Sequence, residues 1–145
     1  MSRITQGLGD LPGISVAVPQ YVPKGQKHNI WITSVGICAG SGGSILNGQD
    51  VDLLFTGELS HHEALAAIEQ GKCVITAFHS NTERAFLKSK MKPALALEIE
   101  RMLEQKEIND MMDRENMGLA GGFEIDASEA DRDPFEIVTR GQTGW

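Results

Sequence analysis

The sequence predicts an α/β fold, with a mixed, largely parallel sheet flanked by helices. Apolar runs of strand length recur along the chain and are separated by turn residues. A strand, a helix and a second strand follow one another within residues 51–78, which is the order of a right-handed βαβ unit with parallel strands. With 145 residues, of which 41% are hydrophobic, the chain has the size of one domain around one core. We therefore expect a single α/β domain over residues 1–145.

Two strands are expected before that unit. Residues 14–18 form an apolar run that ends at Pro19, which favours an edge strand. Residues 30–39 are rich in β-branched and apolar side chains on both faces, as in a strand at the middle of a sheet. The glycine-rich residues 40–44 match neither glycine fingerprint for phosphate binding, so they favour a strand-to-helix turn. An anion held by the backbone amides of this turn is the alternative.

Residues 51–55 and 72–78 are the predicted strands of the βαβ unit, with a helix over 61–70 between them. Ser60 stands at the N-cap of that helix and Glu63 three residues later, which is the spacing of a capping box. Gly71 ends the helix.

The remaining third of the chain predicts helices followed by short strands. Asn81 or Thr82 can cap a helix that begins near Glu83, and Pro93 suits the first position of a second helix, which ends near residue 105. Residues 106–122 lack a sustained period and end in glycines, so we expect a flexible insert there, with a methionine contact surface as the alternative. Residues 123–127 alternate like a half-buried strand, and 135–138 can add another.

Composition excludes several classes of function. The net charge of −7 argues against direct nucleic-acid binding, which needs clustered lysine and arginine. There is no run of 18 apolar residues and no signal-peptide pattern, so we expect a soluble cytoplasmic protein without membrane contact, with the nucleus or the mitochondrion as alternatives. Cys38 and Cys73 are predicted to be free thiols in buried strands.

One pair of residues has the spacing of metal ligands. His79 and Glu83 are four residues apart, so on a helix they lie on one face and can reach the same ion. An imidazole and a carboxylate suit zinc, manganese or iron. From its spacing alone this pair is also compatible with an ordinary helix surface.

Other polar side chains are expected near this pair, because the segments after strands 51–55 and 72–78 leave the same edge of a parallel sheet. These surrounding residues are Thr56, Glu58 and one of His61 or His62. The adjacent histidines diverge by about 100° on a helix, so they cannot both face one ion. A capping or solvated role for Glu58 is the alternative.

Several stretches together resemble the C-terminal half of the Nif-three-like family, in its eukaryotic, fungal type. This is the family of Ngg-one-interacting factor three, also called type 2 GTP cyclohydrolase I homologues. The stretches that carry the resemblance are residues 38–42, 54–62, Gly71, 79–84 and 128–134, and the likeness extends over about residues 14–139. The resemblance implies half of that family's α/β fold.

The resemblance also implies a dinuclear metal site and a homo-oligomer, since family members hold two ions and form rings. The family's His-x-x-x-Glu ligands match His79 and Glu83. The His-His-Pro motif and the aspartate ligand of the family's N-terminal half are absent, so only part of the metal site is expected here.

Two hypotheses about function follow. The first is a metal-dependent hydrolase of the cyclohydrolase-like group, inactive as this chain alone. The second is a non-catalytic interaction module for a protein partner in transcriptional regulation.

Overall fold

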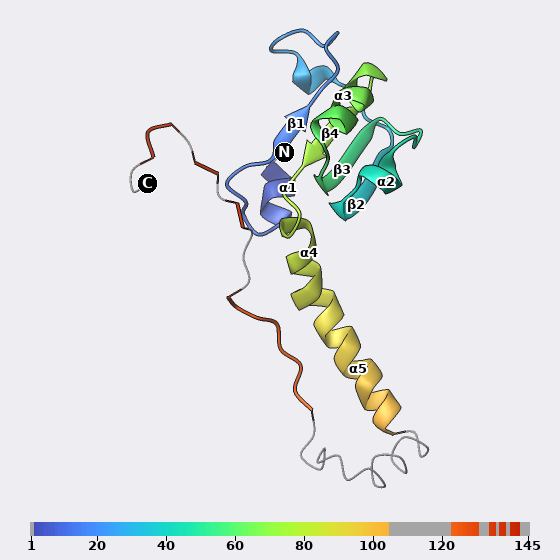
Figure 1. Cartoon of the computed structure of the whole chain (residues 1–145), viewed down its shortest axis with the longest axis vertical. Coiled ribbons are helices and arrows are strands. Elements are labelled where there is room, and N and C mark those ends of the chain that lie inside the picture. The colour runs from blue at the N-terminus through green and yellow to red at the C-terminus, as the bar shows by residue number, and fades with distance from the viewer. Residues whose placement is uncertain (1, 105–122, 131–133, 136, 139, 143–145) are drawn as a thin grey trace. The chain divides into compact units, whose positions relative to one another are not determined.

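The computed structural model describes residues 2–104, 123–130, 134–135, 137–138 and 140–142. They belong to two compact units, residues 1–83 with 132–145 and residues 84–131. The elements, shown in Figure 1, are α1 (Ser2–Gly7), β1 (Ser15–Ala17), η1 (Lys27–Asn29), β2 (Val35–Ser41), α2 (Gly43–Leu46), β3 (Leu53–Glu58), α3 (His61–Glu69), β4 (Cys73–Thr76), α4 (Asn81–Phe86), η2 (Leu87–Met91) and α5 (Lys92–Leu103). The insert predicted at 106–122 lies outside the described residues.

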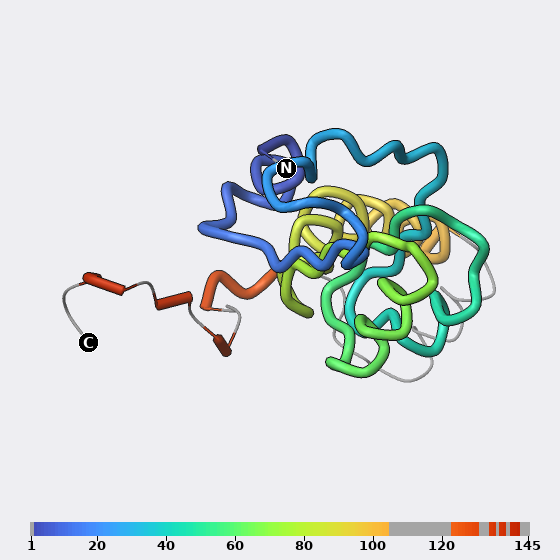
Figure 2. The backbone as a smooth tube through the Cα atoms, turned by 90° about the horizontal axis from the view of Figure 1, so that it is seen from above, coloured from blue at the N-terminus to red at the C-terminus, as the bar shows by residue number. Residues whose placement is uncertain are grey.

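The four strands of the first unit form one sheet in the order β1-β4-β3-β2. Strand β3 pairs in parallel with β2 and with β4, while β1 pairs antiparallel with β4. The predicted fold class, a mixed and largely parallel sheet with helices, is confirmed. The prediction that the first strand is an edge strand is also confirmed. Because β1 and β2 are opposite edges, residues 18–34 must cross the sheet's width, as Figure 2 shows from above.

The prediction for residues 30–39 was wrong in two respects. Residues 30–34 are not strand, and β2 lies at an edge of the sheet rather than in its middle. Its apolar side chains alternate in burial, with Val35 47% and Ile37 69% exposed. The apolar run therefore indicated a strand correctly, but apolar side chains on both faces did not make that strand central.

The predicted βαβ unit is present as β3, α3 and β4, and it contains the core. Leu54, Ala67 and Val74, one from each of these elements, pack together with Leu46 of α2. Helix α3 begins with the predicted capping box. The Ser60 hydroxyl accepts the Glu63 N–H at 3.3 Å, and the Glu63 carboxylate accepts the Ser60 N–H at 2.8 Å. The N–H of Ser60, followed by its hydroxyl, holds the pKa of the Glu63 carboxyl below its ordinary value.

In the second unit the helix continues through η2, a π-helical turn, into α5. Pro93 was predicted at the first position of this helix and is the second residue of α5, and the break before it is a π turn and not a gap. Among the described residues no helix is both long and apolar enough to span a membrane.

Residues 123–127 were predicted to be a strand and are not. The side chains alternate between half-buried and exposed, but no strand among the described residues pairs with the segment. Its ion pairs, Lys92 to Asp126 at 2.8 Å and Lys88 to Glu129 at 2.9 Å, are with the helix. The described residues of 135–138 are not strand either.

Asp52 connects the crossing segment to the start of β3. Its carboxylate oxygen Oδ2 accepts hydrogen bonds from the hydroxyl and N–H of Thr33 at 2.6 and 2.8 Å and from those of Ser34 at 3.0 and 2.9 Å. Led by the Thr33 hydroxyl, these bonds lower the pKa of Asp52 from 3.8 to about 2.

We predict that Asp52→Asn lowers the midpoint temperature of thermal unfolding at neutral pH. The difference from the unchanged chain should become smaller in acid. The folded-state pKa of Asp52 is depressed, so its stabilisation is present above pH 3.8 and is lost as the pH falls to about 2. Thermal unfolding from about pH 5 to about pH 2.5 measures this. Asp50→Asn is the control, and a deficit independent of pH would contradict the prediction.

Candidate functional site

The ends of β2, β3 and β4 meet around the peptide groups of Gly40. The Thr82 hydroxyl accepts the Gly40 N–H at 2.8 Å and donates to the carbonyl of His79 at 2.7 Å. The hydroxyl of Thr56, which is fully buried in β3, donates to the Gly40 carbonyl at 2.9 Å. Two threonine hydroxyls therefore fix the end of β2 to β3 and to the turn that starts α4.

Close approach of these segments requires glycine at position 57. A Cβ atom there would lie 2.6 Å from the Gly40 carbonyl oxygen and 2.9 Å from the His79 Cα. The expected turn at residues 40–44 is a strand-to-helix turn into α2. The N–H of Gly42 donates to the Glu58 carbonyl at 3.3 Å, and the N–H of Gly40 donates to the Thr82 hydroxyl. Both amides therefore make hydrogen bonds within the protein.

His79 lies between two carboxylates. Its Nδ1 is 2.8 Å from Glu58 Oε1, and its Nε2 is 3.5 Å from Glu83 Oε1. All three side chains are about half exposed, at 46% for His79, 54% for Glu58 and 44% for Glu83. Glu58 is the last residue of β3, His79 follows β4 and Glu83 is on α4, so two neighbouring parallel strands and the next helix bring these groups together where the strands end.

The separation of His79 Nε2 and Glu83 Oε1 suits a shared divalent ion. Two tetrahedral ligands at about 2.1 Å from zinc are about 3.4 Å apart, and the observed distance is 3.5 Å. A hydrogen bond from the other ring nitrogen to a carboxylate is the usual way of orienting a histidine ligand, and Glu58 is placed for it. Among the described residues there is no group of three or more His, Cys, Asp or Glu side chains able to hold a metal. The chain thus presents two adjacent donors and an orienting carboxylate.

Gly40 forms the surface beneath these donors. Its φ is +65°, and a Cβ built on it would lie 2.7 Å from Glu83 Oε1 and 2.8 Å from His79 Nε2. Any side chain at position 40 would collide with both donors. Glycine at position 40 therefore lets the two donors keep these positions, from which a side chain there would displace them.

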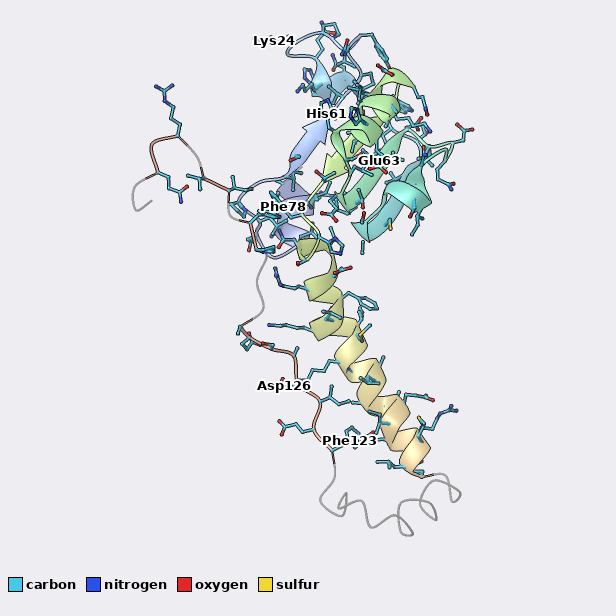
Figure 3. All side chains as sticks on the ribbon, in the orientation of Figure 1. Lys24, His61, Glu63, Phe78, Phe123 and Asp126 are labelled. Atoms are coloured by element: carbon cyan, nitrogen blue, oxygen red, sulfur yellow. The ribbon has the colours of Figure 1, made fainter. Side chains whose placement is uncertain are left out.

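Phe78, immediately before His79, has an unusual backbone conformation. Its φ is +65°, a region in which a bulky residue other than glycine is rare. Figure 3 shows Phe78 at the edge of the sheet from which α4 starts. Such a conformation costs on the order of 1–3 kcal/mol and often occurs at functional sites. Here it turns the chain out of β4 directly before the histidine.

A pocket of about 440 Å³ borders the same edge. It includes Glu58 and His79, and its other lining residues are Ser15, Gly57, Leu59, Thr76, Phe78, Ser80, Pro134 and Phe135. Thr56, which sequence reasoning placed near the site, is buried beneath it in β3 and supports Gly40.

That one of the adjacent histidines lies near this group stays a prediction. The rings of His61 and His62 contact each other edge to face, with centroids 5.6 Å apart, and both residues are exposed at the start of α3. Neither makes a hydrogen bond to Glu58, His79 or Glu83 in the described part of the chain.

The two cysteines are free. Cys73 is buried in β4, and that burial raises the pKa of its thiol. A protonated core thiol does not act as a nucleophile at neutral pH.

Sequence reasoning missed the contribution of Gly40 and gave Thr82 only a capping role. The hydrogen bond between them joins residues 42 positions apart. Nothing in the local sequence signals it. The proximity of His79 and Glu83, by contrast, was expected from their spacing, although His79 stands in the turn before α4 and not on the helix.

Comparison with known proteins identifies the family. Residues 13–113 match the family model of Duf34/NIF3 (NGG1p interacting factor 3). The chain is 57% identical over 96 residues to the Schizosaccharomyces pombe protein NIF3 homolog, an alignment covering 66% of this chain and 34% of that protein. It is 41% identical over 104 residues to human NIF3-like protein 1, covering 72% of this chain and 22% of that protein.

Solved structures show the same fold. A Staphylococcus aureus hypothetical protein superposes with a TM-score of 0.54 at 20% identity, covering 93% of this chain and 37% of that one. A Bacillus cereus protein related to NIF3 also gives 0.54, at 22% identity, covering 93% and 30%. The chain thus spans about a third or less of the length of these relatives. Its correspondence to the C-terminal half of the family stays a prediction. The family match and the sequence identities together show that this chain belongs to the Duf34/NIF3 family.

Proposed function

We propose that this chain provides part of a divalent-metal site, with His79 Nε2 and Glu83 Oε1 as ligands. The observation that carries the proposal is the facing of these two donors at 3.5 Å above Gly40, with the second nitrogen of His79 on Glu58. Nitrogen and oxygen donors of this kind suit zinc, manganese or iron. The expected second ion of the family site would need ligands beyond this pair.

Each residue has a separate role in this proposal. Glu58 accepts the Nδ1 proton of His79, which fixes the ring's tautomer and directs Nε2 toward the ion. Glu83 contributes negative charge, and Gly40 leaves the space. When bound, a divalent ion supplies Lewis acidity, and we propose a hydrolase as the reaction class of the completed site. With two ligands from this chain, we expect weak binding and no turnover by this chain alone.

We predict that His79→Ala and Glu83→Ala each weaken zinc or manganese binding by at least about tenfold, since each removes one of two donors. Isothermal titration of the full chain with each metal salt measures this. His28→Ala, an exposed histidine on η1, is the matched control. Equal affinity of the His79 variant and the unchanged chain would refute the proposed site.

Glu58→Ala should lower metal affinity by about 10–100-fold, the usual cost of losing the carboxylate that orients a histidine ligand. The metal affinity of Glu58→Gln should lie between those of Glu58→Ala and the unchanged chain, because its amide oxygen still accepts the Nδ1 proton. Glu69→Ala removes an exposed carboxylate at the end of α3 and should change nothing. If Glu58→Ala and Glu69→Ala bind metal alike, Glu58 does not position His79.

Gly40→Ala and Gly48→Ala form a matched pair. Both glycines have positive φ, so each substitution should cost about 1–2 kcal/mol of stability. Only at position 40 would the new Cβ meet His79 and Glu83, since nothing lies within 4 Å of it at position 48. We expect Gly40→Ala alone to lose metal binding, with unfolding midpoints measured alongside. Comparable affinity of the two variants would contradict the role of Gly40.

A further inference from the structure

The pocket at the ends of the strands shares two residues with the candidate metal site. Its volume of about 440 Å³ lies within the range of about 300–1,000 Å³ that is usual for small-molecule pockets. Glu58 and His79 are part of its wall, and all of its lining residues belong to the first unit. A molecule held in this pocket would therefore lie beside the ring of His79.

The backbone of Phe78 brings an aromatic ring and His79 to the same pocket. Along a regular strand, successive side chains point to opposite faces, so Thr76 and Phe78 would share one face and His79 would take the other. The positive φ of Phe78 breaks this alternation, and all three residues line the pocket. The strained conformation thus joins an aromatic wall to a proposed metal ligand.

A second ring reaches the pocket from the C-terminal part of the chain. Phe135 lines it next to Pro134, and 71% of Phe135 is exposed. The segment is held near β1, since the Ile137 side chain lies 3.2 Å from a Cβ built on Gly13. An exposed phenylalanine in a pocket wall offers apolar area that a ligand can bury.

Hydroxyl groups form another part of the wall. Ser15 of β1 and Thr76 of β4 are register partners in the antiparallel pair, so their side chains are on the same face of the sheet. Both line the pocket, and each hydroxyl can donate and accept a hydrogen bond. A ligand with polar groups at its edge can therefore be oriented here.

The charges in the wall select against anions. Among the described lining residues there is no lysine or arginine, and the charged side chain is the carboxylate of Glu58 beside the imidazole of His79. A phosphate or carboxylate group in this pocket would lack a cationic partner and would be repelled by Glu58. The lining therefore favours an uncharged ligand.

We propose that this pocket is the substrate subsite of the proposed metal site and binds an uncharged, planar ring of a small-molecule substrate. The rings of Phe78 and Phe135 supply apolar contact area. The hydroxyls of Ser15 and Thr76 bind polar groups at the edge of the ring. The role as substrate subsite rests on the proposed metal site, whereas binding of the ring does not require the metal.

Titration of the isotope-labelled full chain with 2-naphthamide, an uncharged bicyclic amide, tests the proposal by two-dimensional NMR in the presence of EDTA. We expect a Kd of about 0.1–1 mM, as is usual for a ligand of this size. The amide signals of Thr76, His79 and Ser80 shift, because these residues line the pocket. The signal of Gly71, which precedes β4 at the other end of the strand, does not.

Phe135→Ala and Phe86→Ala form a matched pair. Both side chains are exposed, at 71% and 54%, and Phe86 is on α4 and does not line the pocket. Phe135→Ala weakens binding of 2-naphthamide by at least about fivefold through the lost aromatic contact. Phe86→Ala leaves it unchanged, and circular dichroism checks that both variants are folded.

The carboxylate 2-naphthoate, which has the same ring system, tests the selection by charge. At low salt it binds at least about fivefold more weakly than 2-naphthamide, because its negative charge faces Glu58. The difference narrows as salt rises and screens the two charges.

Three results overturn the proposal. They are 2-naphthamide that does not bind or that shifts signals away from the pocket, equal binding by Phe135→Ala and Phe86→Ala, and 2-naphthoate that binds as tightly as 2-naphthamide. Each is obtained without metal, so none can arise from failure of the metal site. If 2-naphthamide binds but the metal titrations fail, the role as substrate subsite is refuted and ring binding alone stands.

Discussion

The arrangement of the site depends on how the backbone of Gly40 is held. Its N–H and its carbonyl are each bound by a threonine hydroxyl, Thr82 from the turn into α4 and Thr56 from β3. Thr82 also donates to the His79 carbonyl, so one hydroxyl links the end of β2 to the residue that carries the imidazole. Without the Thr82 hydroxyl the N–H of Gly40, a buried residue, would lose this hydrogen bond, at a cost of about 1–3 kcal/mol. This penalty keeps the three strand ends together.

The donor groups meet because the strand ends do. Glu58 ends β3 and His79 follows β4, and the parallel pairing of these strands brings the two to the same edge. The positive φ of Phe78 then ends the extended path of β4 before His79, and α4 begins two residues after the histidine. Glu83 follows on the first turn of that helix, which brings its carboxylate to Nε2 while Glu58 takes Nδ1. The positive φ of Phe78 has a structural reason, because a regular continuation of β4 would carry His79 away from Glu83.

The elements that could be predicted from the sequence are those decided by neighbours in the chain. The Ser60 and Glu63 capping box, the βαβ unit and the spacing of His79 and Glu83 all depend on residues within about one helix of each other. Strand position in the sheet is decided by pairing between distant segments, so the apolar residues 30–39 gave no reliable sign that β2 is an edge. The alternation at 123–127 was genuine but arose from contact with a helix, which sorts an extended segment into two faces as a sheet does. The hydroxyl links to Gly40 could not be predicted for the same reason, since they depend on the finished sheet.

Burial separates the scaffold of the site from its chemistry. Thr56 is fully buried and bonded to Gly40, whereas His79, Glu58 and Glu83 are each about half exposed to solvent. Exposed polar side chains add little to the core, so the fold should survive their replacement, while a bound ion adds stability that grows with the logarithm of its concentration relative to its dissociation constant. Changes at His79 or Glu83 therefore report on binding, and changes at Thr56 report on the frame that holds the donors in place. Gly40 belongs to both groups, because its backbone is part of the frame and its missing side chain is the space between the donors.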